Sequence, residues 1–287
     1  RLRTEWGLGA ESQILLQDQL DFLLARMRPQ LEEQLKAAGA SGDLGREIET
    51  VASYTRMLAL GAAYGQEVQS GLKRLTLLLD RFSRGDRPAR EIGTTLLTTV
   101  GALETVVTST HGSVTPAMRR QAFGLLADAL GLHAKQLRAL AEEAAAKGLP
   151  QAGDLAARAN LADLRRARAL LGKGDPVAAL DAARDVQAAT AEGTVQQAQT
   201  LIQLARAAAR LRDTLPPEAQ QELSPQRLAD LVTDARFRWL GVTKTPGEAA
   251  MVGFELVRGI ARAGHIVRAL EVLERVKAKA PDDPVLA

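Results

Sequence analysis

The side chains best suited to acid–base or metal chemistry in this chain are its three histidines. His111 falls in an expected turn, His133 on an expected helix, and His265 directly after a glycine. None has a second histidine or a carboxylate three or four residues away, which is the spacing that places two metal ligands on one helix face. We interpret all three as ordinary surface or turn histidines and expect no metal site.

Carboxylate pairs and phosphate-binding loops give no stronger signal. Glu32–Glu33 and Glu142–Glu143 are adjacent, so the two side chains of each pair point in diverging directions on a helix. The chain has no GxxxxGK(S/T) phosphate loop, no GxGxxG after a strand, no GxSxG elbow and no ExxH pair. We identify no catalytic or cofactor-binding residue and expect a protein that is not an enzyme and has no cofactor.

Basic residues are the other candidates for function. Arginines within 158–173 and 206–212 recur at four- and seven-residue spacings. This places several guanidinium groups on one side of a helix, where they could meet phosphates. Asp154, Asp163 and Asp213 are interleaved with them, so a solvated polar face is the alternative interpretation.

The segment 235–248, ARFRWLGVTKTPGE, joins positive charge to an aromatic surface just before a Pro–Gly break. That combination suits nucleic acid or an acidic peptide. Alternatively, Trp239 is a packing anchor in a core with few aromatic residues. The candidate contacts with a protein partner or with nucleic acid are Arg158, Arg165, Arg166, Arg168, Lys173, Arg206, Arg210, Arg236, Arg238, Trp239 and Lys244.

The composition indicates helices. The 287 residues are 46% hydrophobic but only 3% aromatic, so we expect a core of Leu, Ala and Val. Strong helix formers dominate, and no clean alternating run predicts a strand. We therefore predict an all-α fold.

Charge and cysteine content narrow the class of protein. Lys and Arg (37) barely exceed Asp and Glu (34), whereas dedicated nucleic-acid-binding proteins are usually more basic. The absence of cysteine excludes disulfides, thiolate zinc sites and cysteine nucleophiles. No apolar run is long enough to span a membrane. We expect a cytoplasmic protein, with a signal peptide removed upstream as the open alternative.

The N-terminal half predicts long helices. They are expected over 10–38, 46–82, 92–110 and 116–147. Pro29 should kink the first, because proline removes a backbone donor and clashes with the preceding turn. Ser113 or Thr115 can cap the last helix, ahead of Pro116 in its first turn. We predict a long-helix bundle over residues 1–148.

Shorter helices follow the turn at 148–154. They are expected over 155–172, 175–191, 194–213, 225–240, 247–263 and 266–280. The change in helix length makes this turn the predicted domain boundary, with stacked helical hairpins over residues 149–287. A continuous superhelix would give the same pattern and stays the alternative.

The stretch from Ala250 to Pro284 reads as two short helices joined at Gly264. The small residue Ala269 follows five positions after this glycine, and Pro281 closes the second helix. The bulky apolar positions are Leu256, Ile260 and Leu273. In these residues the stretch resembles a tetratricopeptide repeat, a 34-residue helix–turn–helix unit.

The resemblance has departures. Val257 stands where the family prefers Gly, and Val276 where it prefers Ala. A degenerate second unit lies around 160–191, where Gly174 and Ala179 repeat the turn but Ala191 replaces the closing proline.

Three turn glycines add a possible longer period. Gly85, Gly174 and Gly264 are 89 and 90 residues apart, but Arg90 occupies the small-residue position after the first. Three homologous units and a coincidence among helical turns both stay open.

The resemblance implies a helical-hairpin scaffold that binds other proteins, and it brings no catalytic residue. We therefore predict a non-enzymatic helical scaffold that binds a protein partner or assembles with itself. A nucleic-acid-associated protein that uses the arginine-rich helix faces is the alternative.

Overall fold

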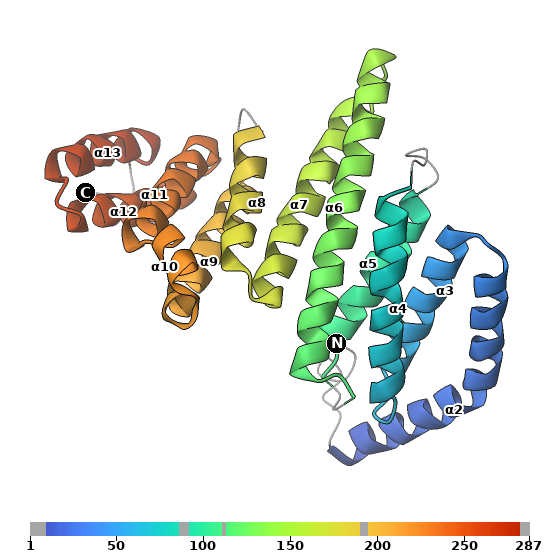
Figure 1. Ribbon diagram of the computed structural model, residues 1–287. Helices are drawn as coiled ribbons and strands as arrows, with labels where there is room; N and C mark the ends of the chain where they lie inside the picture. Colours follow the sequence, from blue (N-terminus) through green and yellow to red (C-terminus); the bar gives the residue numbers. More distant parts are fainter. Residues whose placement is uncertain (1–9, 86–91, 111–112, 190–194, 282–287) are drawn as a thin grey trace. The chain divides into compact units, whose positions relative to one another are not determined.

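The computed structural model describes residues 10–85, 92–110, 113–189 and 195–281. Within these ranges the regular elements are helices and none is a strand (Figure 1). This confirms the all-α prediction. The chain divides into two compact units, with unit 1 ending at Gly174 and unit 2 beginning at Asp175.

Unit 1 contains the long helices. They are α2 (Ala10–Ala40), α3 (Leu44–Leu58), α4 (Gly65–Ser83), α5 (Gly93–Thr108), α6 (Pro116–Ala146) and α7 (Ala152–Lys173). Pro29 lies inside α2, and Figure 1 shows this helix sharply bent into two limbs, in agreement with the predicted kink. The core is built mainly from leucine, with Leu58, Leu72, Leu96, Leu103 and Leu130 fully buried.

The single long helix predicted over 46–82 is wrong, because the chain turns between Leu58 and Gly65. Side chains from distant segments hold this turn. The Asp21 carboxylate accepts a hydrogen bond from Ala62 N at 3.0 Å. Ser109 Oγ donates to the Ala59 carbonyl at 2.8 Å, and Ser113 Oγ donates to the Gly61 carbonyl at 2.7 Å. These partners replace the helical hydrogen bonds that the turn gives up.

The N-terminal cap of α6 is Thr115, one of the two residues predicted for this position. Thr115 Oγ1 accepts a hydrogen bond from Met118 N at 3.2 Å, and Pro116 occupies the first turn. This matches the predicted start, since a proline at that position loses no helical hydrogen bond.

The compact units divide after Gly174, whereas the sequence placed the boundary at 148–154. Helix α7 packs along α6 in unit 1, and Ala159, Ala162 and Ala167 are buried. Small side chains allow the two helices to approach closely. Gly174, in the left-handed conformation with φ +96°, ends α7.

Unit 2 contains shorter elements. They are α8 (Pro176–Ala189), α9 (Val195–Leu211), the 3-10 turn η1 (Arg212–Thr214), α10 (Pro217–Glu222), α11 (Pro225–Val242), α12 (Pro246–Arg262) and α13 (Ile266–Lys279). The predicted helices agree with α8, α9 and α11–α13, except that α10 and η1 were not expected. The predicted end of one helix at 191 and the predicted start of the next at 194 lie outside the described residues, as does Pro284.

Helices α12 and α13 pack closely around a glycine. A Cβ atom built on Gly253 would lie 2.3 Å from a methyl carbon of Val276, far inside van der Waals contact. Val276 is fully buried, and Ala269 and Ile260 are buried beside the same contact. The missing side chain at Gly253 therefore makes room for a valine where the resembled family prefers alanine.

Candidate partner-binding groove

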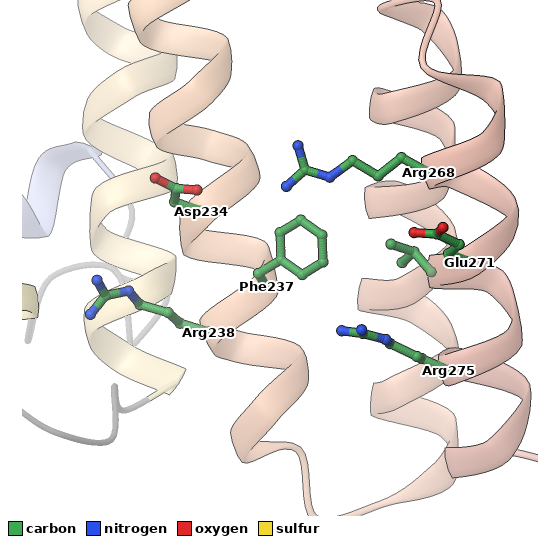
Figure 2. Close-up of a pocket in the computed structure, with 7 residues that line it drawn as sticks. Asp234, Phe237, Arg238, Arg268, Glu271 and Arg275 are labelled. Carbon is green, nitrogen blue, oxygen red and sulfur yellow. The ribbon is translucent and has the colours of Figure 1, made fainter.

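A groove lies between α11 and α13 in unit 2. It encloses a cavity of about 440 Å³. Its lining residues are Asp234, Phe237, Arg238, Arg268, Glu271, Val272 and Arg275 (Figure 2). Guanidinium groups, carboxylates and an aromatic ring thus meet in one depression of the surface.

Local sequence signals fix the two helices that line the groove. Ser224 caps α11 by accepting a hydrogen bond from Arg227 N at 3.2 Å, and Pro225 follows in the first turn. Helix α13 begins after Gly264, whose φ of +85° is accessible to glycine at little cost. Leu240 of α11 and Val272 of α13 are buried in one apolar core, to which α12 contributes while it packs against both helices.

The arginines of α13 dominate the open side of the groove. Arg268 and Arg275 are seven residues apart, so they share one helix face. Figure 2 shows both side chains extending from α13 toward α11, with the Phe237 ring between the helices. The Arg268 guanidinium carbon lies 5.5 Å from the centre of that ring, within cation–π range.

Charge in the groove is only partly balanced. Among the described residues, neither Arg268 nor Arg275 forms an ion pair. Asp234 and Glu271 line the same cavity and place two carboxylates among the cations. Such an arrangement can hold an anionic group beside a hydrogen-bond donor.

The predicted residues of 235–248 separate onto different sides of α11. Arg236 braces α11 against α12, donating to the Glu255 carboxylate at 3.1 Å and to its backbone carbonyl at 3.2 Å. Its side chain is only 14% exposed, and this burial lowers its pKa although Glu255 opposes the effect. Arg238 lines the groove but runs to the side of α11 away from α13 in Figure 2.

Trp239 and Lys244 do not join Arg238 in the groove. The Trp239 indole N–H donates to Glu248 Oε1 at 2.7 Å, and its ring packs against the core of α12 and α13. In the structure Trp239 is therefore a packing anchor with its polar edge occupied. Lys244 is exposed in the connection to α12.

The basic residues of α7 face carboxylates of unit 1. Arg165 pairs with Glu104 of α5. Arg158 lies 4.0 Å from Asp154, and Arg166 lies 4.0 Å from Asp163.

These α7 residues are divided between two hollows. Arg165 and Arg168 line a cavity of about 670 Å³ beside Phe123. Arg166 lines a different cavity of about 450 Å³ that includes Asp128. Burial raises the pKa of Asp128, while the charges of Lys173 and Arg166 oppose that rise. The predicted α7 cluster is therefore not one continuous basic surface.

Arg206 and Arg210 lie exposed on α9. Neither forms an ion pair among the residues that the structure describes. Arg206 is close enough to Arg236 for its charge to lower the pKa of that guanidinium. The two α9 residues thus lie in unit 2 but do not line the groove.

The groove residues contributed by α13 were missed in the sequence. Arg268, Glu271 and Arg275 lie at intervals of three and four residues, which is a one-face pattern. That spacing was a usable signal. The stretch was interpreted only as a repeat scaffold, so its charged face received no role.

The histidines give no metal centre. The prediction of a surface position for His133 is wrong, because its ring is buried and Nδ1 lies 2.9 Å from Gln136 Oε1. Burial lowers the His133 pKa, which favours a neutral ring at pH 7. His265 is exposed at the start of α13, and His111 lies outside the described residues.

The described part of the chain offers neither a metal site nor a membrane-spanning helix. No group of three or more His, Asp or Glu side chains there could hold a metal ion. None of the helices in the described ranges combines the length and the apolar character needed to cross a membrane.

Comparison with protein-family models and with curated proteins gives no match. Among solved structures, the chain is similar to the crystal structure of BtubC (BKLC) from P. vanneervenii. The sequence identity is 14%, the alignment covers 87% of this chain and 90% of that chain, and the TM-score is 0.28. A TM-score this low carries no argument about function.

Proposed function

We propose that this protein is a non-enzymatic helical scaffold that binds a protein partner, and that the groove between α11 and α13 takes an acidic segment of that partner. The observation that carries the proposal is the pair Arg268 and Arg275. Both reach into the groove without an ion-pair partner among the described residues. Guanidinium groups in this state favour carboxylates, which they bind through charge-assisted hydrogen bonds.

The spacing of the two arginines restricts the ligand. Seven residues of helix span about 10 Å along the axis. A peptide in the polyproline II conformation has three residues per turn and advances about 3.1 Å per residue, so side chains three positions apart lie on the same side, about 9 Å from each other. We therefore expect two acidic side chains three positions apart in a segment of this conformation, with an apolar side chain between them that turns toward Phe237.

The groove carboxylates favour a peptide over nucleic acid. Asp234 and Glu271 would repel an unbroken run of phosphates. A peptide can instead present backbone N–H groups to these carboxylates and acidic side chains to the arginines. Binding of a single-stranded DNA would therefore contradict the peptide proposal.

The test is fluorescence anisotropy with three labelled probes. The first is a ten-residue peptide with two glutamates three positions apart and a leucine between them, the second has glutamines in place of the glutamates, and the third is a 20-nucleotide single-stranded DNA. We expect the first peptide alone to bind, with an affinity that falls moderately between 50 and 200 mM salt.

Matched variants locate the site. Arg268→Glu/Arg275→Glu should abolish binding of the acidic peptide. Arg258→Glu/Arg262→Glu makes the same charge change at exposed α12 positions that do not line the groove. This control variant should retain most of the peptide binding.

Two results would remove the proposal. Unchanged peptide affinity in the groove variant would show that the groove is not the site. DNA binding without peptide binding, with a steep loss between 50 and 200 mM salt, would favour nucleic acid. In that case an electrophoretic shift at 50 mM salt with Arg165→Ala/Arg166→Ala/Arg168→Ala would test whether α7 contributes.

A further inference from the structure

The N-terminal limb of α2, residues 15–29, exposes large apolar side chains. Leu15 is 60% exposed, Phe22 66% and Leu23 53%. Leu16 and Met27 are also exposed. Apolar side chains gathered this densely on one short helical segment indicate a surface that is covered by another protein.

The limb is attached to unit 1 along one side only. Leu24 is buried, and Asp21 bonds to the turn after α3 through Ala62 N and the Tyr64 hydroxyl. Arg28 reaches Glu67 of α4 at 3.2 Å. These contacts hold the limb at the margin of unit 1 (Figure 1) and leave the face that carries Phe22 uncovered by described residues.

The charges on the uncovered face are arranged symmetrically. Asp18 lies one turn before Phe22 and Arg26 one turn after it, so all three share a face. Neither Asp18 nor Arg26 has an ion-pair partner among the described residues. One negative and one positive charge therefore flank a central aromatic ring at equal distances.

This pattern is self-complementary. If two limbs pack antiparallel about a two-fold axis at Phe22, Asp18 of each copy lies opposite Arg26 of the other. Parallel packing would instead place each charge beside its own kind. We propose that this limb is the interface between two copies of the chain, antiparallel, with Phe22 at the centre and two Asp18–Arg26 contacts.

The remaining side chains fit this arrangement. Leu15 lies seven residues before Phe22 and extends the apolar face at one end, while Leu23 and Leu16 extend it along one edge. The 15 residues of the limb span about 22 Å. A contact of this length falls at the small end of specific interfaces, about 1,200 Å² in total or less, so we expect a dissociation constant in the micromolar range.

Charge reversal gives a direct test of the pairing by sedimentation velocity of the full chain at about 1–200 µM. Asp18→Arg places two arginines at each contact of a homodimer, and Arg26→Asp places two aspartates there. Each variant alone should dimerise about tenfold more weakly or worse than the original chain. An equimolar mixture should recover the dimer, because every arginine of one variant then faces an aspartate of the other.

A second variant tests the centre. Phe22→Glu should leave the chain monomeric, whereas Leu77→Glu, at an exposed site on α4, should leave dimerisation unchanged. Far-ultraviolet circular dichroism checks that each variant stays folded. A monomeric original chain at 200 µM, a Phe22→Glu variant that still dimerises, or a mixture that stays monomeric would each overturn the proposal.

The interface does not depend on the groove in unit 2. Arg268→Glu/Arg275→Glu should dimerise normally, and Phe22→Glu should bind the acidic peptide normally. Failure of either proposal is therefore visible without affecting the other.

Discussion

The arginines of α7 and those of α13 form similar patterns in the sequence, but they face different surroundings. Arg165 of α7 is paired with Glu104, a residue 61 positions earlier in the chain. Arg268 and Arg275 of α13 face a cavity and have no ion pair among the described residues. Arg165 contributes to the structure of unit 1, whereas we propose that the α13 pair is available to a ligand.

The difference shows why density of positive charge is a poor guide to a binding site. A helix face with several arginines can serve as a ligand site only where carboxylates from other elements do not form ion pairs with them. That condition is set by packing, which joins residues far apart in sequence. Stability measurements can separate the two kinds of arginine. Removing an arginine that pairs inside the protein should lower the free energy of unfolding, whereas removing a ligand-binding arginine should leave it nearly unchanged.

The largest loss of stability is expected from Arg138→Ala. Arg138 of α6 pairs with Asp163 of α7, whose side chain is only 9% exposed. Removing the guanidinium leaves a buried carboxylate poorly compensated, so we expect the free energy of unfolding to fall by about 2 kcal/mol. Urea denaturation measures it. Adding Asp163→Asn should recover part of the loss, and no recovery would contradict the assignment of the cost to the stranded charge.

Arg236→Ala should come next. This side chain is largely buried and makes two hydrogen bonds to Glu255, at its carboxylate and its backbone carbonyl. We expect a loss of about 1–2 kcal/mol in unit 2. Arg258→Ala is the matched control, an exposed arginine on α12 with no ion pair among the described residues, and it should change stability by less than about 0.5 kcal/mol. Equal effects in the two variants would remove the distinction between braced and exposed arginines.

Most of the fold could be predicted from periodicity. Apolar spacing gave α2 and α11–α13 to within a few residues, and the helix predicted over 92–110 corresponds to α5. The break between α3 and α4 could not be predicted, because its stability comes from Asp21, Ser109 and Ser113, each more than forty residues from its partner in the turn. Local sequence alone favours continuing that helix.

The candidate site was predicted only in part. Arg238 was among the predicted contacts and lines the groove, whereas Arg236, two residues earlier, braces α12. Residues two apart lie on different helix faces, and the sequence does not say which face meets a neighbour. Arg268 and Arg275 carry the spacing of a shared face, but only the position of α11 turns that face into a groove.

Arg165→Ala tests an arginine whose ion pair inside the protein is largely exposed to solvent. Its ion pair with Glu104 joins two side chains that are each more than a third exposed, so solvent screens the attraction. We expect a loss of about 0.5 kcal/mol. A double-mutant cycle with Glu104→Ala isolates the pair, since each single variant also removes packing. A coupling free energy above about 1.5 kcal/mol would place this arginine with Arg138 as a main support of unit 1.

The smallest change in stability is expected from Arg275→Ala, together with a clear change in binding. Because this guanidinium has no ion pair among the described residues, its removal should alter the free energy of unfolding by less than about 0.5 kcal/mol. The same change removes one charge-assisted contact to an acidic ligand, so the dissociation constant of the acidic peptide should rise about tenfold. Arg165→Ala should leave that constant unchanged. If Arg275→Ala instead destabilised unit 2 as much as Arg236→Ala, Arg275 would have a structural role, and the contrast between the α7 and α13 arginines would fail.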